Sequence, residues 1–131
     1  MNKKWYIGLL MMAVVVIGCK KMTNNKLTGR WHYYYLSIND TGKTQYWTFN
    51  DPDQLIRIIS RYDTVMCDTG TWKIEKDFMS PTFIVVDGLD NNTNGTYQLL
   101  KLNKKFLTIQ RTKSNAGATD GAFCLMEFKK E

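Results

Sequence analysis

The sequence predicts an all-β domain, an antiparallel up-and-down barrel of about eight strands, after an N-terminal signal segment. Short runs of aromatic and β-branched residues are separated by Asn, Asp and Gly at close intervals, and no long helical pattern follows Leu27. The short links make consecutive strands antiparallel neighbours, and closing the sheet removes its exposed edges. We expect strands at roughly 29–38, 44–50, 54–61, 65–75, 82–87, 95–102, 105–112 and 122–130.

The N-terminus has the composition of a bacterial lipoprotein signal. Lys3 and Lys4 give a positive start, an uncharged apolar run follows, and Cys19 stands directly after a small residue, Gly18. The apolar run is shorter than the roughly 20 residues that a membrane-spanning helix needs. Cleavage before Cys19 is therefore favoured over a permanent span, with a plain amino-terminal anchor as the alternative.

This interpretation divides the chain into a signal peptide (1–18), a lipidated Cys19 with a flexible polar tether (19–26) and one barrel domain (27–131). An acyl chain such as palmitate on Cys19 would hold the protein to a membrane. No acidic residue follows directly after Cys19. We expect a lipid-anchored protein of the bacterial cell envelope, on the outer membrane and facing the periplasm.

The other two cysteines, Cys67 and Cys124, leave two alternatives open, which are a disulfide between them or two core thiols. Neither has the spacing of a metal site. The net charge of +6 comes from basic residues that alternate along strands and form no patch. We therefore expect no metal and no nucleic acid as a partner.

Residues 52–61 are open between a strand and a two-turn helix. Asp51, Pro52 and Asp53 together resemble a helix start. However, Ile56 and Ile58 lie on one side of an extended segment whose other side carries arginine and a further isoleucine. The length of the segment favours the strand.

Aromatic residues alternate along the predicted strands and therefore share one face of each. An eight-stranded barrel is just wide enough to be filled by side chains or to hold one small ligand. Two interpretations of the interior are therefore open, a solid core or a binding cavity. The candidate ligand-binding residues are Trp31, Tyr33, Tyr35, Trp47, Phe49, Trp72, Ile74 and Met126.

Nothing in the sequence forms a catalytic constellation. His32 is the one histidine of the chain, and it has no second histidine or paired cysteine from which to build a triad or metal centre. The segment 87–94 is rich in Asp and Asn but lacks the spacing of a calcium loop, so we expect a solvated turn. We expect no enzyme, no catalytic residue and no cofactor.

The residues Leu27-Thr28-Gly29-Arg30-Trp31 resemble the Gly-x-Trp signature of lipocalins. With segments 69–74 and 97–109 following in order, the chain resembles the lipocalin-like lipoproteins of Bacteroidetes-type bacteria. The resemblance implies a barrel whose base is closed by Trp31, with a basic side chain from a late strand across its ring. Arg111 is the expected residue for that position.

Two functions follow as hypotheses. The first is an envelope-anchored binding module that accepts a small apolar or amphipathic ligand in the barrel. The alternative is a solid-core barrel that acts as a structural component or binds another envelope protein. Under the alternative, we expect these exposed side chains to matter most: Tyr34, Tyr46, Arg57 and Arg61.

Overall fold

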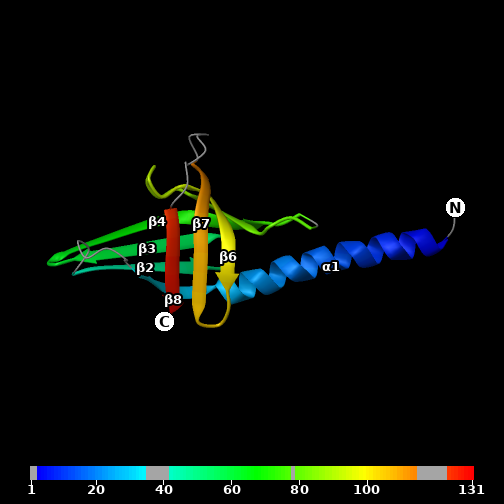
Figure 1. The fold of residues 1–131 in the computed structure, drawn as a ribbon, viewed down its shortest axis with the longest axis horizontal. Helices are drawn as coiled ribbons and strands as arrows, with labels where there is room; N and C mark the ends of the chain where they lie inside the picture. The colour runs from blue at the N-terminus through cyan, green and yellow to red at the C-terminus, as the bar shows by residue number, and fades with distance from the viewer. Residues whose placement is uncertain (1–2, 35–41, 78, 115–123) are drawn as a thin grey trace.

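The computed structural model describes residues 3–34, 42–77, 79–114 and 124–131, and within these ranges the side chains of 13–17, Cys19 and Cys124 are left out. One helix precedes eight strands (Figure 1). The elements are α1 (Lys3–Leu27), β1 (Gly29–Tyr33), β2 (Lys43–Asn50), β3 (Gln54–Arg61), β4 (Thr64–Glu75), β5 (Phe83–Asp87), β6 (Gly95–Leu102), β7 (Phe106–Ser114) and β8 (Cys124–Lys130).

The strands form one closed antiparallel barrel in which each pairs with its neighbours in sequence and β8 pairs with β1. The predicted fold class is therefore confirmed. Closure is carried by three Cα pairs between β1 and β8, which include Trp31 opposite Lys130 and Tyr33 opposite Phe128. Closure leaves no edge strand in the sheet. The β3–β4 hairpin extends beyond the closed part, since β5 pairs with β4 only from Thr71 onward.

The ambiguous segment 52–61 forms a strand from Gln54 onward. Every residue of β3 pairs with β2 on one side and with β4 on the other. These two complete ladders bury Leu55 and place Ile59 on the inner face. Tertiary pairing thus overrides the local helix-start signal at Asp51.

The helix α1 continues through the segment expected to be a flexible tether. Lys20 to Leu27 contain neither glycine nor proline, and their Lys, Met and Leu residues favour helix. Leu27 is fully buried against the barrel. In the described part of the chain, no helix combines the length and apolar character that a membrane crossing requires. The cleavage site and the lipid on Cys19 stay predictions.

The connections between strands alternate between the two ends of the barrel. We call the end that receives α1 the base, and the described connections 51–53 and 103–105 also lie there. At the opposite end, the mouth, lie the described connections 62–63 and 88–94, together with the last residues of β1 and β7 and the first residues of β2 and β8. Figure 1 shows α1 and the tip of the β3–β4 hairpin pointing in opposite directions. The N-terminal segment therefore leaves from the end remote from the mouth.

The base is closed by Trp31, which is fully buried. Its indole Nε1 donates a hydrogen bond of 2.7 Å to the carbonyl oxygen of Leu27. The Lys130 ammonium lies 5.1 Å from the centre of the Trp31 ring and donates to the carbonyl oxygens of Lys26 (3.2 Å) and Thr28 (3.0 Å). Lys130 thus ties the end of α1 to the base.

The expectation that Arg111 crosses the Trp31 ring was therefore wrong. Lys130 takes that position because β8, the last strand, pairs with β1 and brings Lys130 directly opposite Trp31. Arg111 lies on β7, and its guanidinium donates to the backbone oxygen of Asn92 at the mouth.

The backbone conformation at position 29, in the Gly-x-Trp segment, requires glycine. Its φ of 130° lies in a region that residues with a side chain rarely adopt. A Cβ at this position would also lie 2.9 Å from Cε of Lys130. Glycine therefore leaves the space through which Lys130 reaches Trp31.

The interior towards the base is solid. Trp47 packs against Phe128 with ring centroids 5.3 Å apart, and Phe49 meets Trp72 edge to face at the same separation. The Trp72 indole donates to the carbonyl oxygen of Asn50, whereas Nε1 of Trp47 has no hydrogen-bond partner among the described residues. The buried core comprises Leu27, Trp31, Trp47, Phe49, Leu55, Trp72, Ile84, Val86, Tyr97, Leu107, Ile109 and Phe128.

We expect the substitution Lys130→Met to lower the free energy of unfolding by about 1–2 kcal/mol, because two hydrogen bonds from a charged donor are lost while the apolar stem is kept. The neighbouring Lys129→Met, at an exposed position, is the matched control and should change it by less than about 0.5 kcal/mol. Urea unfolding of both variants measures the difference. Equal stability of the two variants would contradict the role of Lys130.

Candidate functional site

A pocket of about 350 Å³ opens at the mouth of the barrel. We call it the mouth pocket. Its wall combines apolar side chains with cationic and amide groups, and it is contributed by strands from both sides of the closure between β1 and β8. The lining residues are Tyr33, Lys43, Gln45, Arg57, Ile59, Asp90, Asn92, Thr93, Tyr97, Leu125 and Met126.

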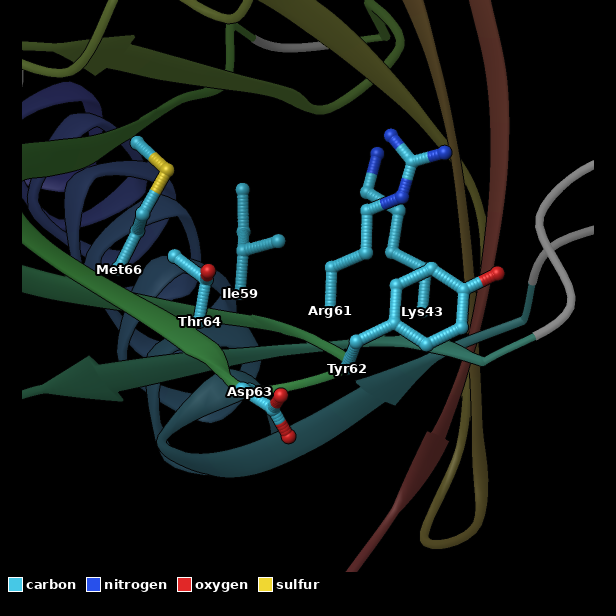
Figure 2. A pocket seen from close by; sticks show the side chains of 7 residues that line it. All are labelled: Lys43, Ile59, Arg61, Tyr62, Asp63, Thr64 and Met66. Carbon is cyan, nitrogen blue, oxygen red and sulfur yellow. The ribbon is translucent and has the colours of Figure 1, made fainter.

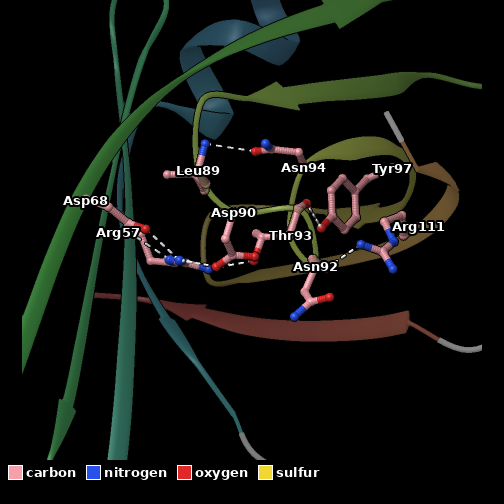
Figure 3. A network of polar contacts seen from close by, with 9 residues as sticks. All are labelled: Arg57, Asp68, Leu89, Asp90, Asn92, Thr93, Asn94, Tyr97 and Arg111. Carbon is pink, nitrogen blue, oxygen red and sulfur yellow. Dashed lines mark hydrogen bonds and ion pairs between the residues drawn. The ribbon is translucent and has the colours of Figure 1, made fainter. Parts of the chain in front are cut away.

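A buried arginine joins β3, β4 and the β5–β6 connection next to this pocket. Arg57 is 5% exposed, and its guanidinium holds Asp68 through two hydrogen bonds, Nε to Oδ1 at 3.0 Å and Nη2 to Oδ2 at 2.5 Å. Nη2 also donates to Asp90 and Nη1 to the Thr93 hydroxyl, both at 2.5 Å (Figure 3). Arg57 therefore fixes the 88–94 connection, which we call the plug, against the opposite strands.

The plug is also held by its own hydrogen bonds. The backbone oxygen of Asp90 accepts from the amides of Thr93 (3.0 Å) and Asn94 (2.8 Å), and the Asn94 side chain accepts from the amide of Leu89 at 2.8 Å. The Tyr97 hydroxyl, from the core below, donates to the backbone oxygen of Thr93. The plug is thus an ordered floor between the mouth pocket and the solid base.

Directly before the plug, β4 and the end of β5 approach each other closely. A Cβ on Gly70 of β4 would lie 2.3 Å from the backbone oxygen of Asp87, the last residue of β5. Only glycine permits this contact.

The charges of the Arg57 cluster stabilise one another. Burial lowers the pKa of the Arg57 guanidinium, but hydrogen bonds and charges from Asp68 and Asp90 outweigh it, so the net shift is upward. Partial burial raises the pKa of Asp90, and hydrogen bonds from Arg57 and Thr93 with the charge of Arg57 bring it below its ordinary value. The pKa shifts of Arg57 and Asp90 therefore both favour the charged forms that make their ion pair.

A second pocket, of about 500 Å³, lies on the inner face of the β3–β4 hairpin (Figure 2). We call it the hairpin pocket. It shares Lys43 and Ile59 with the mouth pocket, so the two are adjacent. Its lining is Lys43, Ile59, Arg61, Tyr62, Asp63, Thr64 and Met66.

The structure divides the eight candidate ligand-binding residues between the pocket and the core. Tyr33 and Met126 line the mouth pocket. Tyr35 lies outside the described residues. The remaining five belong to the core or pack against it and do not line the mouth pocket: Trp31, Trp47, Phe49, Trp72 and Ile74. Trp72 also borders a separate depression on β4 and β5.

The expectation that Arg57 is exposed was wrong. Arg57 shares the inner face of β3 with Leu55 and Ile59, and in the register of β3 with β4 it stands opposite Asp68. The sequence of β3 alone predicts neither partner of Arg57, because Asp68 lies on β4 and Asp90 in the β5–β6 connection. The segment 87–94 is a largely exposed turn, as expected, and Asp90 within it also pairs with the buried arginine.

The other three side chains that we expected to be exposed, those of Tyr34, Tyr46 and Arg61, are not buried. Tyr34 and Arg61 are exposed, and Tyr46 is half-buried on the outer face of β2, with the Arg30 guanidinium 4.1 Å from its ring centre. His32 stacks on Tyr46 with ring centroids 4.8 Å apart. An aromatic and cationic strip on the outside of β1 and β2 is therefore formed by Arg30, His32, Tyr34 and Tyr46.

Cys67 is an exposed free thiol on β4, so it is not a core residue. The Cα partners of Cys67 and of Cys124 are Ile58 and Arg111, on strands at different parts of the barrel. Because Cys67 is free, the disulfide alternative is wrong as well. The side chain of Cys124 lies outside the described residues.

The described residues contain no cluster of three or more His, Cys, Asp or Glu side chains that could hold a metal ion. Comparison of the chain with protein-family models, curated proteins and solved structures gave no match in any of the three. The lipocalin-like assignment therefore stays a prediction.

We expect Asp90→Asn to lower the free energy of unfolding by about 1 kcal/mol at neutral pH. This effect is smaller than that of a fully buried ion pair, because the Asp90 side chain is 48% exposed and solvent screens its charge. The pKa of Asp90 is depressed in the folded state, so its contribution is complete above about pH 5 and is lost as the pH falls through that pKa, below about 3.9.

Urea unfolding of the wild-type protein and the variant between about pH 3 and pH 8 measures this contribution. Asp63→Asn, at an exposed turn position, is the charge-matched control. A difference between wild type and Asp90→Asn that stays constant down to the lowest pH would contradict the ion pair.

Proposed function

We propose that this chain is an envelope-anchored, lipocalin-like binding module whose mouth pocket accepts a small amphipathic ligand. The mouth pocket is the observation that carries the proposal. Its volume of about 350 Å³ lies in the range of small-molecule sites. At roughly 30 Å³ of liquid volume per water, it has room for far more than a few waters.

The chemistry of the wall supports an amphipathic rather than a purely apolar ligand. Ile59, Leu125 and Met126 offer apolar surface, while Lys43 and the Asn92 amide offer polar contacts. A binding site typically combines a mostly apolar wall with a few placed polar groups. The plug and Tyr97 limit the depth that a ligand can reach, so we propose that it does not enter the solid base.

The N-terminal sequence supports the anchor. Lys3, Lys4, the apolar run and Cys19 after Gly18 form a lipoprotein signal. Since α1 leaves from the base, an anchor there would leave the mouth facing away from the lipid surface. A ligand could then enter without crossing the anchored end.

A second candidate function rests on a different observation. The base is solid, and the outer strip of Arg30, His32, Tyr34 and Tyr46 offers stacked rings beside a guanidinium. Aromatic residues and arginine are enriched at protein interfaces. A barrel that contacts another envelope protein through this strip is therefore the alternative to a ligand carrier.

We expect the neutral fluorescent probe N-phenyl-1-naphthylamine to bind the protein, and Ile59→Trp to weaken binding at least about fivefold, because the larger ring fills the pocket that Ile59 lines. Ile58→Trp on the outer face of the same strand is the matched control and should leave binding unchanged. Fluorescence titration measures the affinity, and circular dichroism verifies that both variants fold.

Two outcomes would contradict the proposal. Absence of probe binding to the wild-type protein would favour the interaction-protein alternative. Equal binding by the two tryptophan variants would mean that the probe does not occupy the mouth.

A further inference from the structure

Several exposed lysine side chains gather at the base, around the β6–β7 connection. Lys105 and Lys26 are joined through Lys130, whose backbone amide donates to the carbonyl oxygen of the first (2.8 Å) and whose ammonium donates to that of the second (3.2 Å). Lys129 is the Cα partner of Phe106 in the ladder of β7 with β8. We call the exposed lysines of this region the basic surface: Lys26, Lys101, Lys104, Lys105 and Lys129.

An ordered turn presents the middle of the basic surface. The side-chain oxygen of Asn103 accepts hydrogen bonds from the amides of Lys105 (2.9 Å) and Phe106 (2.8 Å), and its own amide donates to the backbone oxygen of Phe106 (3.0 Å). The Lys101 ammonium lies 5.2 Å from the centre of the Phe106 ring, and Phe106 is 41% exposed. The turn therefore holds an exposed aromatic ring among cationic head groups.

The charges of the basic surface are not neutralised by the described carboxylates. None of its lysines makes an ion pair with a described residue. Glu127 lies next to it on the side of the mouth, opposite Thr108, and the amide of Glu131 donates to the backbone oxygen of Arg30. The other described acidic residues of the base lie between β2 and β3, at the end of β4 and directly after it: Asp51, Asp53, Glu75 and Asp77.

The net charge of this part of the base is therefore positive. The expectation that the basic residues form no patch is wrong at this end of the barrel.

The basic surface adjoins the point at which α1 leaves the barrel. Lys26 lies in the last turn of α1, and Leu27 is buried in the base. Figure 1 shows the β6–β7 connection and the end of β8 close to where α1 joins the barrel. The helix from residue 19 to Leu27 spans about 12 Å at about 1.5 Å per residue. An anchor at Cys19 would therefore hold the basic surface close to the lipid headgroups, at little more than the Debye length of about 8–10 Å.

Anionic headgroups complement such a surface. Each lysine near an anionic bilayer strengthens binding by about fivefold. An exposed aromatic ring beside lysines suits the boundary between headgroups and acyl chains. Because an anchor already brings the protein to the membrane, a few such contacts are enough to orient the barrel.

We propose that the basic surface contacts the anionic headgroups of the membrane that carries the anchor, with the Phe106 ring at the level of the headgroups. The barrel then stands with its base on the lipid and its mouth away from it. This inference rests on the lipid anchor of the proposed function, and it does not depend on ligand binding in the mouth pocket.

The test is lysine acetylation of the full chain, purified in detergent from the membranes of its bacterial expression host. The chain is placed in nanodiscs of phosphatidylcholine alone, or of phosphatidylcholine and phosphatidylglycerol in equal parts. Mass spectrometry gives the rate at which a neutral reagent acetylates each lysine. We expect the rates at Lys104, Lys105 and Lys129 to fall at least about threefold in the anionic nanodiscs, and raised salt to abolish this protection.

Lys113, exposed near the mouth, is the internal control and should react equally in both nanodiscs. The double variant Lys104→Gln/Lys105→Gln should remove most of the protection of Lys129, because it removes two of the charges that face the lipid. Lys105→Gln alone should weaken this protection, whereas Lys113→Gln, which removes the same charge near the mouth, should keep it in full. Circular dichroism verifies that the variants fold.

Three outcomes would overturn the inference and leave the proposed function standing. Equal acetylation rates in the two nanodiscs would show no contact with anionic lipid. Protection of Lys113 as strong as that of Lys129 would show adsorption without a preferred face. Equal protection by inorganic phosphate without nanodiscs would show a surface for free anions.

A different result tests the anchor itself. If the chain separates from the nanodiscs on size-exclusion chromatography, the anchor of the proposed function and this inference fail together.

Discussion

The buried arginine determines how the interior of this barrel is used. Arg57 points inward from β3 at the wall of the mouth pocket. A buried charge in that position is tolerated because three oxygen-bearing side chains hold it. Two of those partners, Asp90 and Thr93, belong to the plug. By drawing the plug into the barrel, the arginine separates a solid aromatic base from a pocket at the mouth.

Because the plug lies between the solid base and the mouth pocket, the two ends of the barrel differ in structure. At the base, Trp31, Lys130 and the last turn of α1 form a closed junction in which a cation covers an indole and binds backbone oxygens. That end is suited to stability and to carrying the N-terminal segment. At the mouth, the inner face of β3 continues beyond the plug with Ile59 and Arg61, so apolar and cationic surface remains open to a ligand.

Much of the fold could be predicted from the sequence because the strand pattern is local. The alternation of Trp31 with Tyr33, and of Trp47 with Phe49, gives both the strand and its inner face. The site could not be predicted in the same way. Arg57 lies among isoleucines on both faces of β3, and its partners depend on the β3–β4 register and on a connection 33 residues away. The base cation was missed for a related reason, since only the pairing of β8 with β1 identifies Lys130.

Under the proposed function, a ligand occupies the mouth above the plug and does not contact the aromatic base. Titration of isotope-labelled protein with decanoate, followed by amide chemical shifts in two-dimensional NMR, tests it most directly. We predict shifts at Tyr33, Gln45, Ile59 and Thr93, with none at Phe49, Trp72 or Val86. Shifts concentrated at the base residues, or spread over the outer strip of β1 and β2 alone, would contradict it.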